Sequence, residues 1–74
     1  MYSPEIRLHL EVGDRRFPLA KLGPDYIVFR EPVEFEPGLA EVVMELDDHT
    51  KRWKVQIERA PLPFDLQVPT IDVK

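Results

Sequence analysis

Apolar and polar residues alternate along most of this chain, and this alternation constrains the fold more than any other feature of the sequence. It is clearest in "EIRLHLEVGDRRFPLAKL", residues 5–22. A two-residue repeat places all apolar side chains on one face of a β-strand and does not fit a helix. The apolar positions before the interruption at Gly13-Asp14 are Ile6, Leu8, Leu10 and Val12, and those after it are Phe17 and Leu19.

Residues 5–22 are therefore expected to form a β-hairpin with a two-residue turn at Gly13-Asp14. This turn places Leu10 opposite Phe17 and Leu8 opposite Leu19, so that apolar residues face apolar residues across the ladder. Pro18 has no N–H group to donate. We therefore expect one side of the second strand to be an edge, or to be interrupted, near Pro18.

A third strand is expected over residues 26–30. It follows the turn sequence Leu-Gly-Pro-Asp at 22–25 and begins with the continuous apolar run "YIVF". A strand that is apolar on both faces is usually covered on both, which favours a central position. Residues 31–38, "EPVEFEPG", predict an extended connection that ends in a Pro-Gly turn.

Residues 39–46 fit two structures. Ala40, Val42, Met44 and Leu46 alternate as in a strand, whereas Leu39, Val42, Val43 and Leu46 fall on one stripe of a helix. The sequence after the "DDHT" loop, residues 47–50, favours the strand, because it alternates in the same way. The helix remains the alternative.

Folding these two segments about the loop gives a specific register. Met44 then lies opposite Trp53, Val42 opposite Val55 and Ala40 opposite Ile57. On the other face, Glu45 meets Arg52 as a pair of opposite charge. A helix gives no such register.

The C-terminal residues 61–74 are expected to form an extended arm on a β-domain of residues 1–60. Three prolines exclude a helix there, and the segment is too apolar for a plain disordered tail. The apolar positions expected on one side of the arm are Leu62, Phe64, Leu66 and Val68. We expect these side chains to contact a partner chain, either a second copy in a homodimer or another protein.

The length and the net charge of the chain exclude several classes of function. A chain of 74 residues without cysteine forms one small domain, which has marginal stability and no disulfides, so it depends on packing or on oligomerisation. A net charge of −4 argues against nucleic-acid binding. The sequence lacks an apolar run of membrane-spanning length and a signal-peptide pattern, so no membrane association and a cytoplasmic location are expected.

Few residues in the sequence are candidates for metal binding or catalysis. His9, His49, Asp47 and Asp48 are the candidate metal ligands, but neighbouring residues rarely converge on one ion, so no metal and no cofactor is expected. Ser3 and Thr50 have no evident base to activate them, so the chain is not expected to be an enzyme.

Arg15 and Arg16, beside the first turn, are the candidate ligand-binding residues. Two guanidinium groups suit a phosphate or a carboxylate. The simpler interpretation is that one of them faces water and the other pairs with Asp14 or Glu11.

Two stretches, "GDRRFPLAKLGPDYIVF" and "PGLAEVVMELDDHTKRWKVQI", cover about two thirds of the chain and resemble the PilZ family of small β-barrels. In that family an arginine-bearing segment precedes a short strand, a Pro-Gly turn and a long hairpin. Members that bind cyclic di-GMP carry Arg-x-x-x-Arg and Asp/Asn-x-Ser-x-x-Gly motifs. Here Arg15 and Arg16 are adjacent, and no serine or glycine follows Asp25 at the second motif. The resemblance therefore implies a barrel and carries over only Arg15 and Arg16 to a nucleotide site.

The sequence thus predicts an all-β fold: a small antiparallel sheet or partly closed barrel of about five strands, with an extended proline-rich C-terminal arm. The expected function is a non-enzymatic module for protein interaction or self-association. The alternative is a PilZ-like binder of an anionic nucleotide such as cyclic di-GMP.

Overall fold

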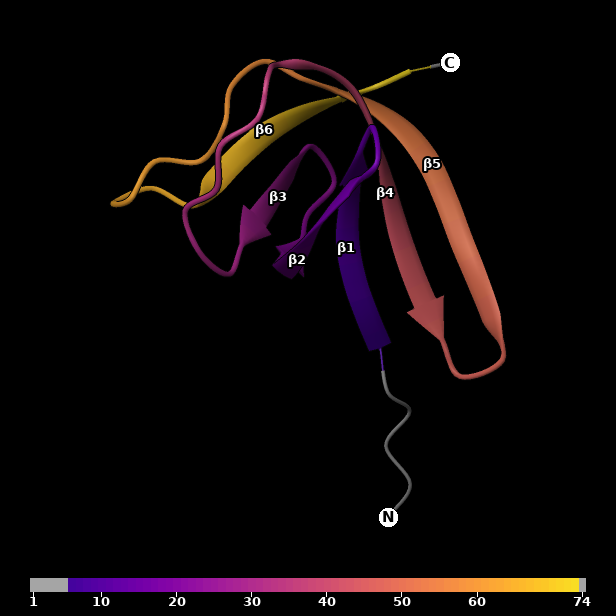
Figure 1. Ribbon diagram of the computed structural model, residues 1–74. Coiled ribbons are helices and arrows are strands. Elements are labelled where there is room, and N and C mark those ends of the chain that lie inside the picture. Colours follow the sequence, from indigo (N-terminus) through magenta and orange to yellow (C-terminus); the bar gives the residue numbers. More distant parts are fainter. Residues whose placement is uncertain (1–5, 74) are drawn as a thin grey trace.

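The computed structural model describes residues 6–73, which form a closed antiparallel barrel (Figure 1). Its strands are β1 (Ile6–Val12), β2 (Arg15–Leu22), β3 (Tyr26–Phe29), β4 (Gly38–Leu46), β5 (His49–Ile57) and β6 (Gln67–Asp72). Their order around the barrel is β1-β2-β3-β6-β5-β4. The prediction of a small antiparallel all-β barrel is confirmed, with six strands in place of about five.

The first hairpin forms as the alternation predicts. Leu10 pairs with Phe17, and Gly13 in the turn has a φ of 62°, a left-handed conformation that glycine adopts without strain. The β1–β2 ladder ends at the pair of His9 with Pro18. The predicted interruption near Pro18 is therefore confirmed, and the ladder stops before the expected pair of Leu8 with Leu19.

A β-bulge at Ala20 keeps β2 in phase with the core. Leu19 pairs with Phe29 on β3, but the next pair joins Lys21 to Val28, so Ala20 is the extra residue. Strict alternation from Leu19 would direct Lys21 inward. After the bulge Lys21 is exposed, and Leu22 packs against the core.

β3 lies between β2 and β6, but every strand of a closed barrel has two neighbours, so the predicted central position does not distinguish β3 from the other strands. Only the inward side chains, Ile27 and Phe29, are fully buried, whereas Tyr26 and Val28 are half-buried. The outer face of β3 is thus only partly covered.

Residues 38–46 are a strand, so the helical alternative is wrong. The expected register with β5 is also wrong, by two residues: Val42 pairs with Trp53, and Met44 pairs with Lys51. The physical reason is the turn, which contains only Asp47 and Asp48, because Leu46 already pairs with His49. A shift of two residues leaves every side chain on its expected face.

The same shift changes the other expected pairs. Ala40 lies opposite Val55 and Gly38 opposite Ile57, while Glu45 lies opposite Thr50 and Arg52 opposite Val43.

The C-terminal segment is extended, but it is not an arm separate from residues 1–60. Gln67–Asp72 form β6, which pairs with β3 on one side and β5 on the other and so closes the barrel. Val68 is completely buried in the protein's own core, and Leu66 packs against that core. The expectation that Val68 contacts a partner chain is therefore wrong, because β3 and β5 each have an edge that β6 fills.

The core is one cluster inside the barrel. Three phenylalanine rings lie together in it: Phe17 and Phe35 have ring centroids 5.4 Å apart, and Phe29 lies 6.4 Å from Phe17. The buried members are Leu10, Phe17, Leu19, Ile27, Phe29, Val42, Val55, Ile57 and Val68. Residues 30–37 have no regular structure, but Phe35 and Val33 in this connection pack against the cluster. In the part of the chain described, there is no helix with the length and apolarity to cross a membrane.

Candidate interaction surface

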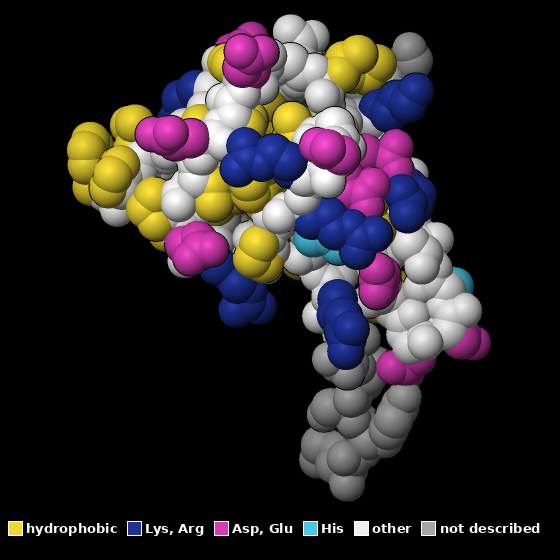
Figure 2. Space-filling model, in the orientation of Figure 1, with side chains coloured by type: hydrophobic (Ala, Val, Ile, Leu, Met, Phe, Trp, Pro, Cys, Tyr) yellow, Lys and Arg dark blue, Asp and Glu magenta, His cyan; other side chains and the backbone are white. Residues whose placement is uncertain are grey.

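The connection between β5 and β6 projects from the barrel as a tight turn, on the left of Figure 1. The backbone groups of Leu62 and Asp65 exchange two hydrogen bonds, each with an N to O distance of 3.0 Å. Pro63 and Phe64 lie between them at the tip. Phe64 is 86% exposed and Leu62 is 43% exposed, and Figure 2 shows hydrophobic side chains gathered at this end of the molecule.

The turn explains why the four apolar residues of the predicted arm do not share one side. Leu62 and Phe64 are exposed on the turn, whereas Val68 lies inside the barrel. The turn at Pro63-Phe64 reverses the chain and breaks the alternation. Only the first two of these residues are therefore available to a partner.

Arg59 holds the turn in place. Its Nη2 donates hydrogen bonds to Oδ2 of Asp65, at 3.2 Å, and to the backbone oxygen of Gln67, at 2.8 Å. Its Nη1 donates to the backbone oxygen of Ala60 at 3.3 Å. One side chain thus bonds both arms of the turn, so Phe64 is presented on an ordered support.

A groove of about 810 Å³ lies beside the turn. One wall is the connection containing Val33 and Phe35, and the other is Pro61 to Pro63. The charged residues of the lining are Arg15, Arg59 and Glu34. We call Leu62, Phe64 and this groove the tip surface. It contains both a projecting aromatic side chain and a hollow with apolar walls.

Arg15 and Arg16, the candidate ligand residues, are held by different partners. Nη1 of Arg15 donates to the backbone oxygen of Glu34 at 2.9 Å, and its guanidinium lies 4.8 Å from the centroid of the Phe17 ring. Nε of Arg16 lies 3.4 Å from Oε2 of Glu11. The expected pairing of one arginine with Glu11 is confirmed. Arg15 fastens the groove wall to the barrel.

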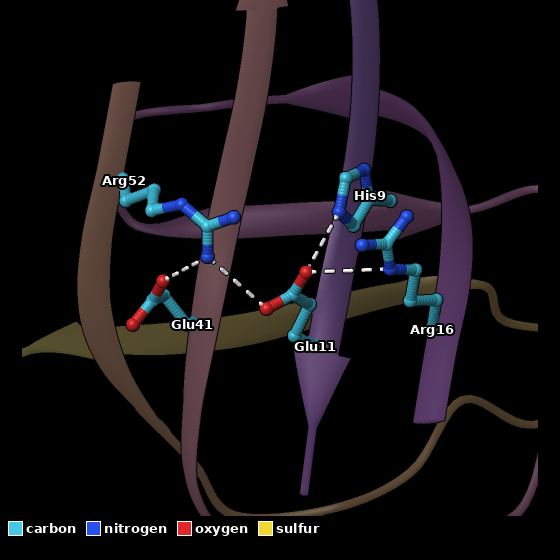
Figure 3. Close-up of polar contacts among 5 residues, drawn as sticks. All are labelled: His9, Glu11, Arg16, Glu41 and Arg52. Atoms are coloured by element: carbon cyan, nitrogen blue, oxygen red, sulfur yellow. Dashed lines mark hydrogen bonds and ion pairs between the residues drawn. The ribbon is translucent and has the colours of Figure 1, made fainter. Parts of the chain in front are cut away.

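A polar cluster crosses the outer face of four strands (Figure 3). Glu11 on β1 is at its centre, with Nε2 of His9 at 3.2 Å from one carboxylate oxygen and Nη1 of Arg52 at 3.2 Å from the other. The same Arg52 nitrogen donates to Glu41 on β4 at 2.8 Å. Arg52 therefore links β5 to β4 and β1.

This cluster covers apolar surface. Val43 lies on the outer face, in register with His9 on one side and Arg52 on the other, yet it is completely buried. Long polar side chains can shield an apolar neighbour with their stems while their charged ends stay in water. The cluster thus has a structural role that accounts for its composition.

The pKa of Glu11 is lowered from its ordinary value of 4.5, first by the hydrogen bond with His9. Partial burial opposes this effect, and the charges of Arg52 and Arg16 add to it. A carboxyl group with a lowered pKa in the folded state stabilises the fold above its unfolded pKa, and this contribution is lost as the pH falls through the folded pKa.

We expect Glu11→Gln to flatten the acid limb of the stability curve. The wild-type chain should lose stability between about pH 5 and pH 3, and the variant should lose less over the same range. Urea denaturation at a series of pH values measures this. Glu36→Gln, which alters an exposed glutamate outside the cluster, is the control and should keep the wild-type slope. Equal slopes for all three proteins would contradict the assignment to Glu11.

The remaining candidates from the sequence do not form one site. His49 and Thr50 belong to β5 and not to a loop, and Nδ1 of His49 lies 3.0 Å from Oδ1 of Asp48. Within residues 6–73, no three His, Cys, Asp or Glu side chains are placed to hold a metal ion. Ser3 lies outside the described residues.

Arg59 was not identified from the sequence, because it is one of ten basic residues and lies outside any alternating segment. The six-residue spacing between Arg59 and Asp65 indicates a contact only once the turn between them is known.

Comparisons with protein-family models, with curated proteins and with solved structures found no match for this chain.

Proposed function

We propose that this protein is a non-enzymatic interaction module that forms a homodimer through its tip surface. The observation that carries the proposal is Phe64, 86% exposed on a turn that Arg59 holds, directly beside a groove with apolar walls. Aromatic side chains that enter a pocket on a partner are the usual anchors of protein interfaces.

A second copy is the partner that this surface fits best. A two-fold axis brings the same patch of both protomers together, so the patch must complement itself. In the proposed dimer, Phe64 of each protomer enters the groove of the other, which would meet this condition. The lining also contains both signs of charge, Arg15 and Arg59 together with Glu34, so one cation of each protomer can face the Glu34 of the other across the axis.

The turn also lowers the entropic cost of association. Pro61 and Pro63 restrict the backbone on either side of Leu62, and Arg59 fixes the arms of the turn. A segment that is ordered before binding loses less conformational freedom when it binds. The tip surface is thus preorganised for a contact.

The test is the mass in solution. Light scattering of the wild-type chain should give twice the mass of 8.7 kDa, and Phe64→Ser should give the monomer. The control is Leu39→Ser, which removes another exposed apolar side chain, 66% exposed on β4, and should leave the dimer intact. Circular dichroism should show the same fold for all three proteins. A wild-type monomer at high concentration, or a dimer that survives Phe64→Ser, would overturn the proposal.

Nucleotide binding at Arg15 and Arg16 is the alternative proposal. A ligand bound there must displace the contacts of Arg15 with Glu34 and of Arg16 with Glu11. Thermal-shift measurements with cyclic di-GMP test this directly. A stabilisation that disappears in the Arg15→Ala, Arg16→Ala double variant would favour the nucleotide over the homodimer as the function.

A further inference from the structure

The barrel has an opening between β1 and β2. The residues that line it are distant in the sequence from the turn at Pro63-Phe64. β1 pairs with β2 only from His9 to Val12. Beyond this point, residues 6–8 pair with β4 alone, and residues 19–22 pair with β3 alone. Among residues 6–73, these two strand edges therefore have no ladder partner across the opening. Figure 1 shows β2 diverging from β1 with distance from their shared turn.

The sequence keeps this part of the ladder open. Pro18, at the last β1–β2 pair, has no N–H group with which to continue the ladder. The bulge at Ala20 follows directly, and a bulge bends a strand and increases its twist. Two successive features thus turn the end of β2 away from β1.

The opening has apolar walls and a basic rim. Its volume is about 770 Å³. The lining includes the apolar residues Leu8, Leu19, Leu22 and Met44 and the cations Arg7, Lys21 and Arg30. No acidic side chain belongs to the described lining, although the whole chain has a net charge of −4.

Two of the cations give the rim its net charge. Arg7 lies opposite Glu45 in the β1–β4 register, so an acid is close to it. Lys21 and Arg30 are both exposed. Lys21 lies 5.9 Å from the centroid of the Tyr26 ring, which carries no charge to neutralise it, and Lys21 has no ion pair with another of the described residues.

We propose that this opening is a docking site for an extended acidic segment of a partner protein, which adds to the barrel as a strand. A free strand edge offers N–H and C=O groups to an incoming backbone, and alternate side chains of the added strand point to opposite sides. In this site one set would contact Leu8 and Leu22, and the other would place carboxylates near Lys21 and Arg30. The inference does not depend on the tip surface.

The probe is a short synthetic peptide of alternating glutamate and valine, titrated into the full chain carrying Phe64→Ser, so that self-association does not interfere. Amide NMR signals of residues 6–8 and 19–22 should shift, and their hydrogen exchange should slow as new ladder bonds form. The Lys21→Glu, Arg30→Glu double variant should bind at least about tenfold more weakly. Binding should also weaken with added salt.

The matched control is the Lys51→Glu, Lys54→Glu double variant, which reverses two exposed charges on β5 and should bind as tightly as the parent. A peptide with lysine in place of glutamate should not bind, and a backbone N-methylated peptide should bind weakly.

Three results would overturn the proposal. One is no shift at about 1 mM peptide, a concentration that detects even weak association. Another is equal binding by the charge-reversed variant or by the N-methylated peptide. The third is a shift of the same amides by a fatty acid or a cyclic dinucleotide but not by the peptide, which would assign the opening to a small anionic ligand.

Discussion

Phe17→Ala is expected to lower the free energy of unfolding by about 3–5 kcal/mol, the usual cost of truncating a buried phenylalanine. Phe17 is 5% exposed and packs against the rings of Phe29 and Phe35. Alanine would leave a cavity between these rings and would also remove the contact of Arg15 with the ring. Small domains are typically stable by about 5–15 kcal/mol, so the variant should be close to unfolding at room temperature.

Urea denaturation of the variant and the wild-type chain measures this difference. The control is Leu39→Ala, because Leu39 is 66% exposed and a surface change of this kind should alter stability by no more than about 0.5 kcal/mol. Similar small losses in both variants would show that Phe17 is not part of the core.

The strands and their inward faces could be predicted from the sequence because alternation alone determines them. The register of the first hairpin followed as well, since Gly13 adopts the left-handed φ of a two-residue turn without strain. The register of the second hairpin did not follow. The sequence "DDHT" is compatible with a loop of four residues or of two, and Thr50 and His49 are equally acceptable in a strand. Because the two choices differ by two residues, the core could be predicted while the cross-strand partners of Met44 and Trp53 could not.

The role of the C-terminal segment depends on tertiary structure. An extended apolar segment can pair with its own domain or with another chain, and the choice depends on whether the rest of the domain leaves a strand edge open. The edges of β3 and β5 do so, and β6 fills both. This could not be inferred while only five strands were expected. The turn at Pro63-Phe64 could not be predicted from the sequence for a related reason, since proline is compatible with an extended segment as well as with a turn.

The candidate sites were predictable only in part. Arg15 and Arg16 are neighbours on a strand, and neighbouring side chains point to opposite faces. Their separation therefore follows from the strand itself. Arg59, Lys21 and Arg30 were missed, because each depends on residues distant in sequence or on the bulge at Ala20. The one sequence signal for the opening between β1 and β2 was Pro18, which predicted an interrupted ladder.

Deleting residues 67–74 is expected to abolish the fold. β6 makes three register pairs with β3 and three with β5, so its loss opens the barrel and leaves two unpaired edges. It also removes Val68, which is completely buried, and exposes the neighbouring Ile27 and Ile57. Exposing one such aliphatic side chain lowers the free energy of unfolding by up to about 1.5–3 kcal/mol. A few such losses equal the whole stability of a typical small domain.

The amide NMR spectrum tests this expectation, because a folded β-barrel gives widely dispersed signals and an unfolded chain does not. The control is a chain that ends at Asp72, which keeps all of β6 and loses the hydrogen bond from Val73 to the backbone oxygen of Lys54. This chain should remain folded, because a single exposed hydrogen bond contributes only about 0.5–1.5 kcal/mol. If the chain without residues 67–74 keeps a dispersed spectrum and a cooperative melting transition, β6 is dispensable, and the barrel must be stable with an open edge between β3 and β5.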